Sequence, residues 1–79
     1  MNAAGGRDLT IAAAAEKFKL TSRETDMLRY LSRNAGNDVI AAELHLSDAT
    51  VRRHIRNLLK KLSIDERRSV TGWLKNYQG

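Results

Sequence analysis

The sequence predicts an all-α fold: a bundle of four helices, preceded by either a further N-terminal helix or a linker. Apolar residues recur every three or four positions in several segments, which is the period of an amphipathic helix, and no segment alternates as a strand does. Short polar breaks separate these segments. With 79 residues, of which 42% are hydrophobic and 29% charged, the chain is expected to form one small globular domain.

Residues 1–19 are assigned either to a short N-terminal helix or to a linker from a larger protein. Asp8 is a suitable N-cap for a helix that ends at Lys19, because the alanines at 12–15 are strong helix formers. Its apolar stripe would consist of Ile11, Ala15 and Phe18. The small residues at 1–6 favour the linker.

A capping box predicts the start of the next helix. Thr21 is its N-cap, and Glu24 reaches back from the third helical position to the N-cap backbone. The buried face of this helix is expected to hold Met27, Leu28 and Leu31. We expect the helix to end at residues 34–36.

Two further helices joined by a short turn form a helix-turn-helix. Asn37 or Asp38 starts the first of them, whose apolar face holds Ile40, Ala41 and Leu44. Residues 45–47 form the turn. Ser47 caps the second helix, at about 48–62, and Asp48 complements its positive N-terminal dipole. The core stripe of this helix is Val51, Ile55, Leu58, Leu59 and Leu62.

A fourth helix is predicted from about Glu66 to Tyr77, after a break in the apolar pattern at residues 63–66. Its apolar residues are Val70, Trp73, Leu74 and Tyr77, at helical spacing. The two aromatic side chains belong either to the core or to an exposed partner surface. These four residues are the candidates for a dimer interface, because they exceed what a small core absorbs.

The positive charge of the chain is concentrated in the helix at 48–62. The whole chain has a net charge of +5, and in this helix five basic residues and one acidic residue give a net charge of +4. The basic side chains lie off the apolar stripe, so the helix has a packed face and a cationic face. A helix that enters the major groove of DNA needs this combination. The alternative is that these side chains only solvate an exposed surface.

Base reading is assigned to Arg52, Arg53 and Arg56, since a guanidinium group can bond guanine O6 and N7 together. Contacts to the DNA backbone are assigned to neighbouring polar and basic side chains, namely Asn37, Ser47, Thr50, His54, Asn57, Lys60 and Lys61. For His54 the alternatives are a packing role and base reading. His45 is expected to be an ordinary turn residue.

Four motifs in this region follow a known pattern. They are Leu20-Thr21-x-Arg23-Glu24, Asn37-x-x-Ile40-Ala41-x-x-Leu44, Ser47-x-x-Thr50-Val51-Arg52-x-His54, and Asn57-Leu58 followed by Lys61-Leu62. Together they resemble the LuxR/GerE-type DNA-binding domain, found at the C-terminus of many bacterial response regulators and quorum-sensing regulators. The resemblance covers about residues 20–74, and we assign the domain to residues 20–79.

The resemblance implies a four-helix domain whose third helix reads DNA, with the three arginines at base-contacting positions and the fourth helix as a frequent dimer interface. Three positions depart from the family pattern. Gly36 replaces a serine, Ser63 replaces a glycine at the end of the third helix, and Arg52 replaces a lysine. The change at Ser63 predicts a strained or differently shaped helix end.

The leading interpretation is a sequence-specific DNA-binding domain of a bacterial transcription regulator that binds double-stranded DNA as a homodimer, with RNA polymerase as a further partner. The alternatives are a sigma-factor-like promoter-recognition domain and a protein-interaction module. We do not expect an enzyme, because the sequence has no paired carboxylates, no nucleophile with a base and no phosphate-binding glycine loop.

Composition narrows the partners further. The chain has no cysteine, and its two histidines are too few for a metal cluster, so we expect no metal site and no cofactor. No apolar run approaches the length of a membrane span, and no secretory signal is present. We therefore expect a cytoplasmic protein that makes no membrane contact.

Overall fold

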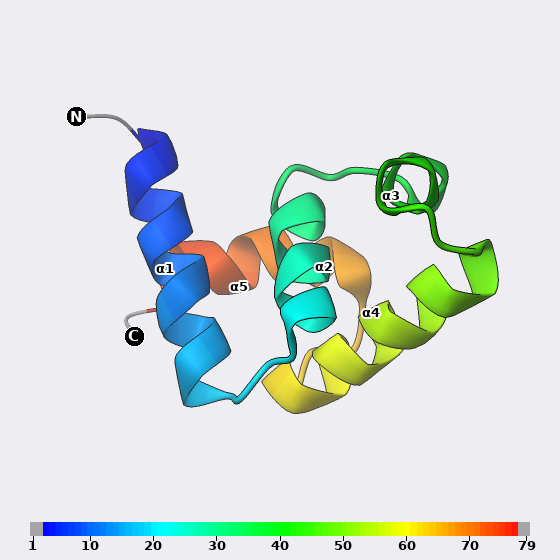
Figure 1. The fold of residues 1–79 in the computed structure, drawn as a ribbon. Helices are drawn as coiled ribbons and strands as arrows, with labels where there is room; N and C mark the ends of the chain where they lie inside the picture. Colours follow the sequence, from blue (N-terminus) through cyan, green and yellow to red (C-terminus); the bar gives the residue numbers. More distant parts are fainter. Residues whose placement is uncertain (1–2, 78–79) are drawn as a thin grey trace.

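The computed structural model describes the backbone of residues 3–77, and among them it contains five α-helices, one short 3-10 helix and no strand. The helices are α1 (Ala3–Lys17), α2 (Ser22–Ser32), α3 (Asn37–Leu44), α4 (Asp48–Leu62), the 3-10 helix η1 (Arg67–Ser69) and α5 (Val70–Asn76). Helices α1 and α5 lie at one end of the molecule, α3 and the start of α4 lie at the other, and α2 runs between them (Figure 1). The all-α prediction is confirmed.

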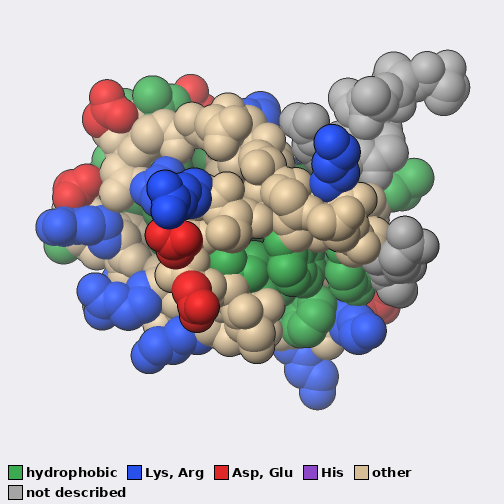
Figure 2. Space-filling model, turned by 180° about the vertical axis from the view of Figure 1, so that it is seen from behind, with side chains coloured by type: hydrophobic (Ala, Val, Ile, Leu, Met, Phe, Trp, Pro, Cys, Tyr) green, Lys and Arg blue, Asp and Glu red, His purple; other side chains and the backbone are tan. Residues whose placement is uncertain are grey.

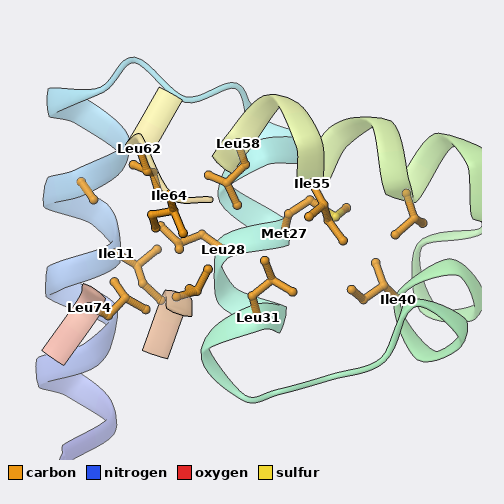
Figure 3. Packing of buried hydrophobic residues seen from close by; sticks show 13 residues of the cluster. Ile11, Met27, Leu28, Leu31, Ile40, Ile55, Leu58, Leu62, Ile64 and Leu74 are labelled. Atoms are coloured by element: carbon orange, nitrogen blue, oxygen red, sulfur yellow. The ribbon is translucent and has the colours of Figure 1, made fainter. Parts of the chain in front are cut away.

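The core is built around α2, which packs against α1, α4 and α5. Met27 and Leu28 are fully buried, and the buried side chains of the surrounding helices point toward them (Figure 3). The core residues are Ile11, Ala14, Met27, Leu28, Leu31, Ile40, Val51, Ile55, Leu58, Leu62, Ile64, Val70 and Leu74. The predicted buried faces of α2 and α4 are confirmed, except that Leu59 is only half-buried.

The N-terminal segment is a helix rather than an extended linker, and it contributes to the core. Ile11 and Ala14 are buried, whereas Ala15 and Phe18 are half-buried. The predicted start at Asp8 is wrong, because α1 already begins at Ala3. Packing of one face against α2 and α5 stabilises the helix beyond what local propensity indicates. No helix among the described residues is long and apolar enough to cross a membrane.

Four helices end in the same backbone arrangement. A residue one or two positions after each helix has a left-handed conformation, with φ between 55° and 58°, although none of the four is glycine; they are Lys19, Asn34, His45 and Ser63. The N–H of the next residue then bonds a carbonyl five residues back, in the pairs Leu20–Ala15, Ala35–Tyr30, Leu46–Ala41 and Ile64–Leu59, at 2.9–3.1 Å. Each of these next residues is apolar and packs on the core. This arrangement fixes the direction in which the chain leaves each helix.

Ser63 is the position where a family glycine is replaced. Its φ of 57° and ψ of 40° are the left-handed values that glycine adopts without cost. The helix end therefore keeps the glycine-type shape, and the expectation of a different shape is wrong. The strain of placing a Cβ in this conformation remains, and the burial of Ile64 directly after it offsets that strain.

The predicted capping box is present, and a third residue completes it. The Glu24 N–H donates to Thr21 Oγ1 at 3.1 Å, and the Thr21 N–H donates to Glu24 Oε1 at 2.9 Å. Lys61 donates from Nζ to the same Glu24 oxygen at 2.7 Å and to the Lys19 carbonyl at 3.1 Å. Because Glu24 is only 5% exposed, this ion pair ties the end of α4 firmly to the start of α2.

The Glu24 carboxyl has a pKa below its ordinary value of 4.5. Burial alone raises the pKa, but hydrogen bonds from Lys61 and from the Thr21 backbone outweigh it. A depressed pKa in the folded state means that the carboxylate contributes stability above its unfolded pKa. This contribution is lost as the pH falls through the folded pKa.

The C-terminal segment differs from its prediction in two ways. Its first turn is the 3-10 helix η1, so α5 is shorter than expected. Val70 and Leu74 are 0% and 9% exposed, which corrects the assignment of these two residues to a dimer surface. Trp73 and Tyr77 are half-buried and stack at 4.9 Å between ring centroids, with Phe18 at 5.8 Å and 6.3 Å from them.

We predict that Lys61→Met lowers the free energy of unfolding by about 1–3 kcal/mol at neutral pH, because it leaves a buried carboxylate without its cation. Lys60→Met removes the same charge from an exposed neighbour and is expected to change stability by less than about 0.5 kcal/mol. Chemical denaturation measures both. The difference between the variants should shrink as Glu24 becomes protonated in acid, and equal losses at neutral pH would contradict the assigned ion pair.

We predict that Ser63→Gly raises the free energy of unfolding by about 0.5–1 kcal/mol, because it removes the cost of a Cβ in the left-handed conformation. Ser69→Gly is the matched control, since Ser69 has a φ of −84°, where glycine brings only added flexibility. Thermal and chemical denaturation should separate the two changes in sign. A destabilised Ser63→Gly variant would show that the serine side chain stabilises this turn.

Candidate nucleic-acid interface

Helices α3 and α4 form a helix-turn-helix whose turn has a defined backbone. His45 has the left-handed conformation, and the Leu46 N–H bonds the Ala41 carbonyl at 3.0 Å. The two helices pack against each other, with Ile40 and Val51 fully buried. The predicted spacing of helix, turn and helix is therefore confirmed, and the N-terminal end of α4 projects from the molecule beside α3 (Figure 1).

The first turn of α4 is closed by its predicted cap. Ser47 Oγ accepts a hydrogen bond from the Thr50 N–H at 3.1 Å and donates one to Thr50 Oγ1 at 2.9 Å. The two hydroxyl groups thus lie together at the helix N-terminus, where backbone N–H groups and the helix dipole attract anions. This places both residues where a DNA phosphate could approach.

The arginines of α4 lie on the side away from the core. Successive residues of an α-helix are turned by about 100°, so Arg53 and Lys60 point almost opposite the buried stripe. Arg52 and Arg56 lie one turn apart on one flank, and His54 and Asn57 lie on the other. All three arginines are exposed. Viewed from behind, Lys and Arg side chains gather at the end of the molecule that holds α3 and α4 (Figure 2).

Arg52 is held by an acidic residue one turn earlier. Its Nε lies 3.0 Å from Asp48 Oδ2, and the two side chains are 63% and 58% exposed. Such an exposed pair contributes little to stability. Its effect is on direction, because it fixes one edge of the guanidinium group against the helix. Sequence analysis assigned Asp48 only to the helix dipole.

A surface hollow of about 350 Å³ lies along the flank of α4 that carries Arg52 and Arg56. Ile55 and Leu59 provide its apolar part, and Asn37 and Arg67 complete the lining. Side chains of three arginines from two elements therefore line one depression. An anionic group would find a high local positive potential there.

Sequence analysis missed Arg67, whose role depends on the fold. Its Nη1 donates to Asn37 Oδ1, and its Nη2 donates to the Ala35 carbonyl at 2.9 Å. This fork joins η1 to the start of α3 and leaves the amide N–H groups of Asn37 free to donate elsewhere. The residues are thirty positions apart, so local spacing carries no signal of the pairing.

The other end of α3 is fixed by a tyrosine of α2. Tyr30 donates from its hydroxyl group to Glu43 Oε1 at 2.7 Å, and this hydrogen bond raises the pKa of Tyr30. The Arg33 guanidinium lies 5.3 Å from the centre of the same ring. Together with the Arg67 fork, this contact determines how α3 sits against α2 and hence where α4 emerges.

The start of α3 shows why a glycine is accommodated before it. Gly36 is the N-cap, and it has no side chain to close the helix. A Cβ at this position would lie 2.8 Å from Asp38 Oδ1, so the Asp38 carboxylate occupies the space that a serine side chain would need. Asp38 is the acidic residue in the first turn of α3, where a negative charge interacts favourably with the helix dipole.

Two further points concern Lys61 and metal binding. Lys61 lies on α4, but its ammonium group bonds Glu24 and the Lys19 carbonyl. Among the described residues, no group of three or more His, Cys, Asp or Glu side chains could hold a metal ion. The site is therefore a cationic protein surface formed by α3, α4 and η1.

Comparison of the sequence with known proteins identifies its family. The family model described as bacterial regulatory proteins, luxR family, matches residues 19–74. The chain is 46% identical over 52 residues to the nitrate/nitrite response regulator protein homolog of Haemophilus influenzae, covering 66% of this chain and 25% of that protein. It is also 46% identical over 52 residues to the nitrate/nitrite response regulator protein NarP of Escherichia coli, covering 66% of this chain and 24% of that protein.

A third relative is the CsgBAC operon transcriptional regulatory protein of Escherichia coli, 37% identical over 60 residues, which are 76% of this chain and 28% of that protein. The chain thus spans about a quarter of the length of the curated relatives it matches. No solved structure matches the chain.

We predict that Arg67→Lys lowers the free energy of unfolding by about 1–2 kcal/mol, because lysine keeps the charge but loses the rigid planar group that bonds Asn37 and the Ala35 carbonyl from two separate nitrogens. The control is Arg68→Lys, since the Arg68 side chain is 82% exposed. Urea denaturation of both variants tests the prediction. Equal stabilities would mean that the fork does not hold α3.

Proposed function

The chain belongs to the luxR family of bacterial regulatory proteins and carries the DNA-binding domain of a transcription regulator, and from this premise we propose that α4 enters the major groove of double-stranded DNA and reads its sequence. The observation that carries this proposal is the amphipathic α4 itself. Its apolar stripe is buried, and its exposed side carries three arginines within the first turns of the second helix of a helix-turn-helix.

Base reading is the proposed role of Arg52, Arg53 and Arg56. All three are exposed near the end of α4 that projects from the molecule. A guanidinium group that reaches the groove floor can bond guanine O6 and N7 together through a rigid planar edge, which a lysine at the same position lacks. The Arg52 substitution relative to the family pattern therefore favours guanine in the recognised sequence.

Backbone contacts are proposed for side chains on the rim of this surface. They are Asn37, Ser47, Thr50, His54, Asn57 and Lys60. Lys61 is proposed to act differently from its first assignment. Its ammonium group is engaged by the buried Glu24, so its contribution is to position α4 rather than to hold a phosphate.

Assembly and context are also proposals. Pairs of helix-turn-helix domains commonly bind half-sites about one helical turn apart, and we propose such a homodimer on DNA. With Val70 and Leu74 buried, the surface left for pairing here is the half-buried aromatic pair of Trp73 in α5 and Tyr77 directly after it, next to Phe18 directly after α1. Contact with RNA polymerase, and a place in the bacterial cytoplasm beside the chromosome, would follow from a role in transcription.

Catalysis is not part of the proposal. The family that matches is one of regulatory proteins rather than of enzymes. Binding, orientation and release of DNA are the only steps that the described surface of α3, α4 and η1 is proposed to perform.

We predict that Arg56→Ala and Lys60→Ala have different effects on DNA binding. Arg56→Ala should cost about 1–3 kcal/mol on a duplex selected from a random pool and should relax base preference at one position. Lys60→Ala should weaken selected and random duplexes alike. It should also reduce the steepness of the log–log salt dependence by about 0.9, the value for one lost phosphate contact.

Fluorescence anisotropy titrations at several salt concentrations measure all of these quantities. The unmodified chain should lose affinity steeply as salt rises, because released counterions drive the association. Binding that is independent of salt would contradict the proposed surface. Equal losses on both duplexes for both variants would contradict the division between base reading and backbone contact.

A further inference from the structure

We propose that Asp48 is a positioning residue for Arg52, which orients the guanidinium group so that its terminal Nη1/Nη2 edge faces a guanine. The inference rests on the proposed function, because it concerns how the same surface selects a base. It adds a specificity-determining role for a residue that makes no base contact itself.

The geometry of the ion pair carries the inference. Asp48 is the first residue of α4 and Arg52 lies one helical turn later, so both side chains stand on the same flank. The contact is between Asp48 Oδ2 and Arg52 Nε at 3.0 Å. A guanidinium group has five N–H donors, and this ion pair lies on the Nε side of the group, so the two terminal NH₂ groups stay available. These form the edge that can bond guanine O6 and N7 together.

The charge pattern of α4 supports the same role. Asp48 is the only acidic residue in this helix, and it lies at the end proposed to approach the phosphates. For non-specific attraction to DNA its charge is unfavourable. Favourable interaction with the helix dipole is the competing explanation, and the Asp48→Asn variant below separates the two. By restricting the direction of Arg52, Asp48 makes a favourable contribution that offsets its own repulsion of the phosphates.

The surroundings of Arg52 make such a restraint useful. Arg52, Arg56 and Arg67 line the same hollow, and like charges push their side chains apart. An arginine side chain without a partner samples many rotamers and loses this freedom on binding. Asp48 restricts the rotamers of Arg52 before DNA binds, so less rotamer freedom is lost on binding. This favours the base that the terminal guanidinium edge can bond. A lysine at position 52 would gain no such directional benefit.

The test is selection of bound duplexes from a random DNA pool by the 79-residue chain and four variants. Arg52→Ala identifies the position that Arg52 reads. Asp48→Asn removes the acceptor charge, and Asp48→Glu keeps a carboxylate one turn from Arg52. Asp65→Asn is the matched control, because it removes an exposed acid outside α4. Anisotropy titrations then compare the selected duplex, the same duplex with that guanine replaced, and a random duplex.

We expect the unmodified chain to prefer the guanine duplex over the substituted one by about tenfold, the discrimination typical of one good bidentate contact. Asp48→Asn should reduce this preference at least about threefold and raise affinity for the random duplex, since a charge that repels phosphate is gone. Asp48→Glu should restore the preference, and Asp65→Asn should leave it unchanged.

Several outcomes would overturn the inference. If Asp48→Asn lowers affinity for all three duplexes in equal proportion, Asp48 only stabilises the helix end. If Arg52→Ala loses the guanine preference and Asp48→Asn keeps it, Arg52 reads the base without help, and the proposed function stands. If the unmodified chain selects no sequence at all, the proposed function fails and the inference fails with it.

Discussion

The packing of α2 against α4 determines the direction of every functional side chain on α4. The buried face of α2, with Met27 and Leu28 at its centre, meets the apolar stripe of α4. Because that stripe packs into the core, the arginines on the other sides of α4 face solvent. The Lys61–Glu24 ion pair fixes the C-terminal end of the same contact, and α3 packs against α4 as well.

The two ends of the molecule carry different surfaces. At one end, α3 is held by the Arg67 fork at its start and by Tyr30 near its finish, which fixes the helix-turn-helix as a rigid unit. At the other end, α1 packs against α5, with Ile11 and Ala14 buried and Phe18, directly after α1, against Trp73. The cationic surface and the aromatic surface therefore lie apart, and DNA binding at one leaves the other free.

Local sequence patterns predicted α2, α3 and α4 well, because capping residues and helical periodicity are properties of neighbouring positions. The capping box at Thr21 and the N-cap at Ser47 are where the sequence placed them. What the sequence could not predict depends on distant pairs. The Arg67 fork joins residues thirty positions apart, and Lys61 meets Glu24 across thirty-seven.

Burial could not be predicted from apolar spacing alone. An apolar side chain at helical spacing has the same local signal whether it meets a neighbouring helix or solvent. Val70 and Leu74 are buried because α5 packs against α1 and α2, so only the aromatic half of the expected dimer surface remains accessible. The start of α1 was also misplaced, because the helix begins at Ala3 rather than after Asp8.

The central claim is that α4 meets DNA with its arginine side while α2 holds its back. The most direct test is a ¹⁵N NMR titration of the chain with a selected duplex, following every backbone amide. We expect the largest shift changes in the first half of α4 and at the start of α3, with α1 and α5 nearly unaffected at one chain per half-site. Changes centred on α1 and α5, with α4 unaffected, would contradict the account.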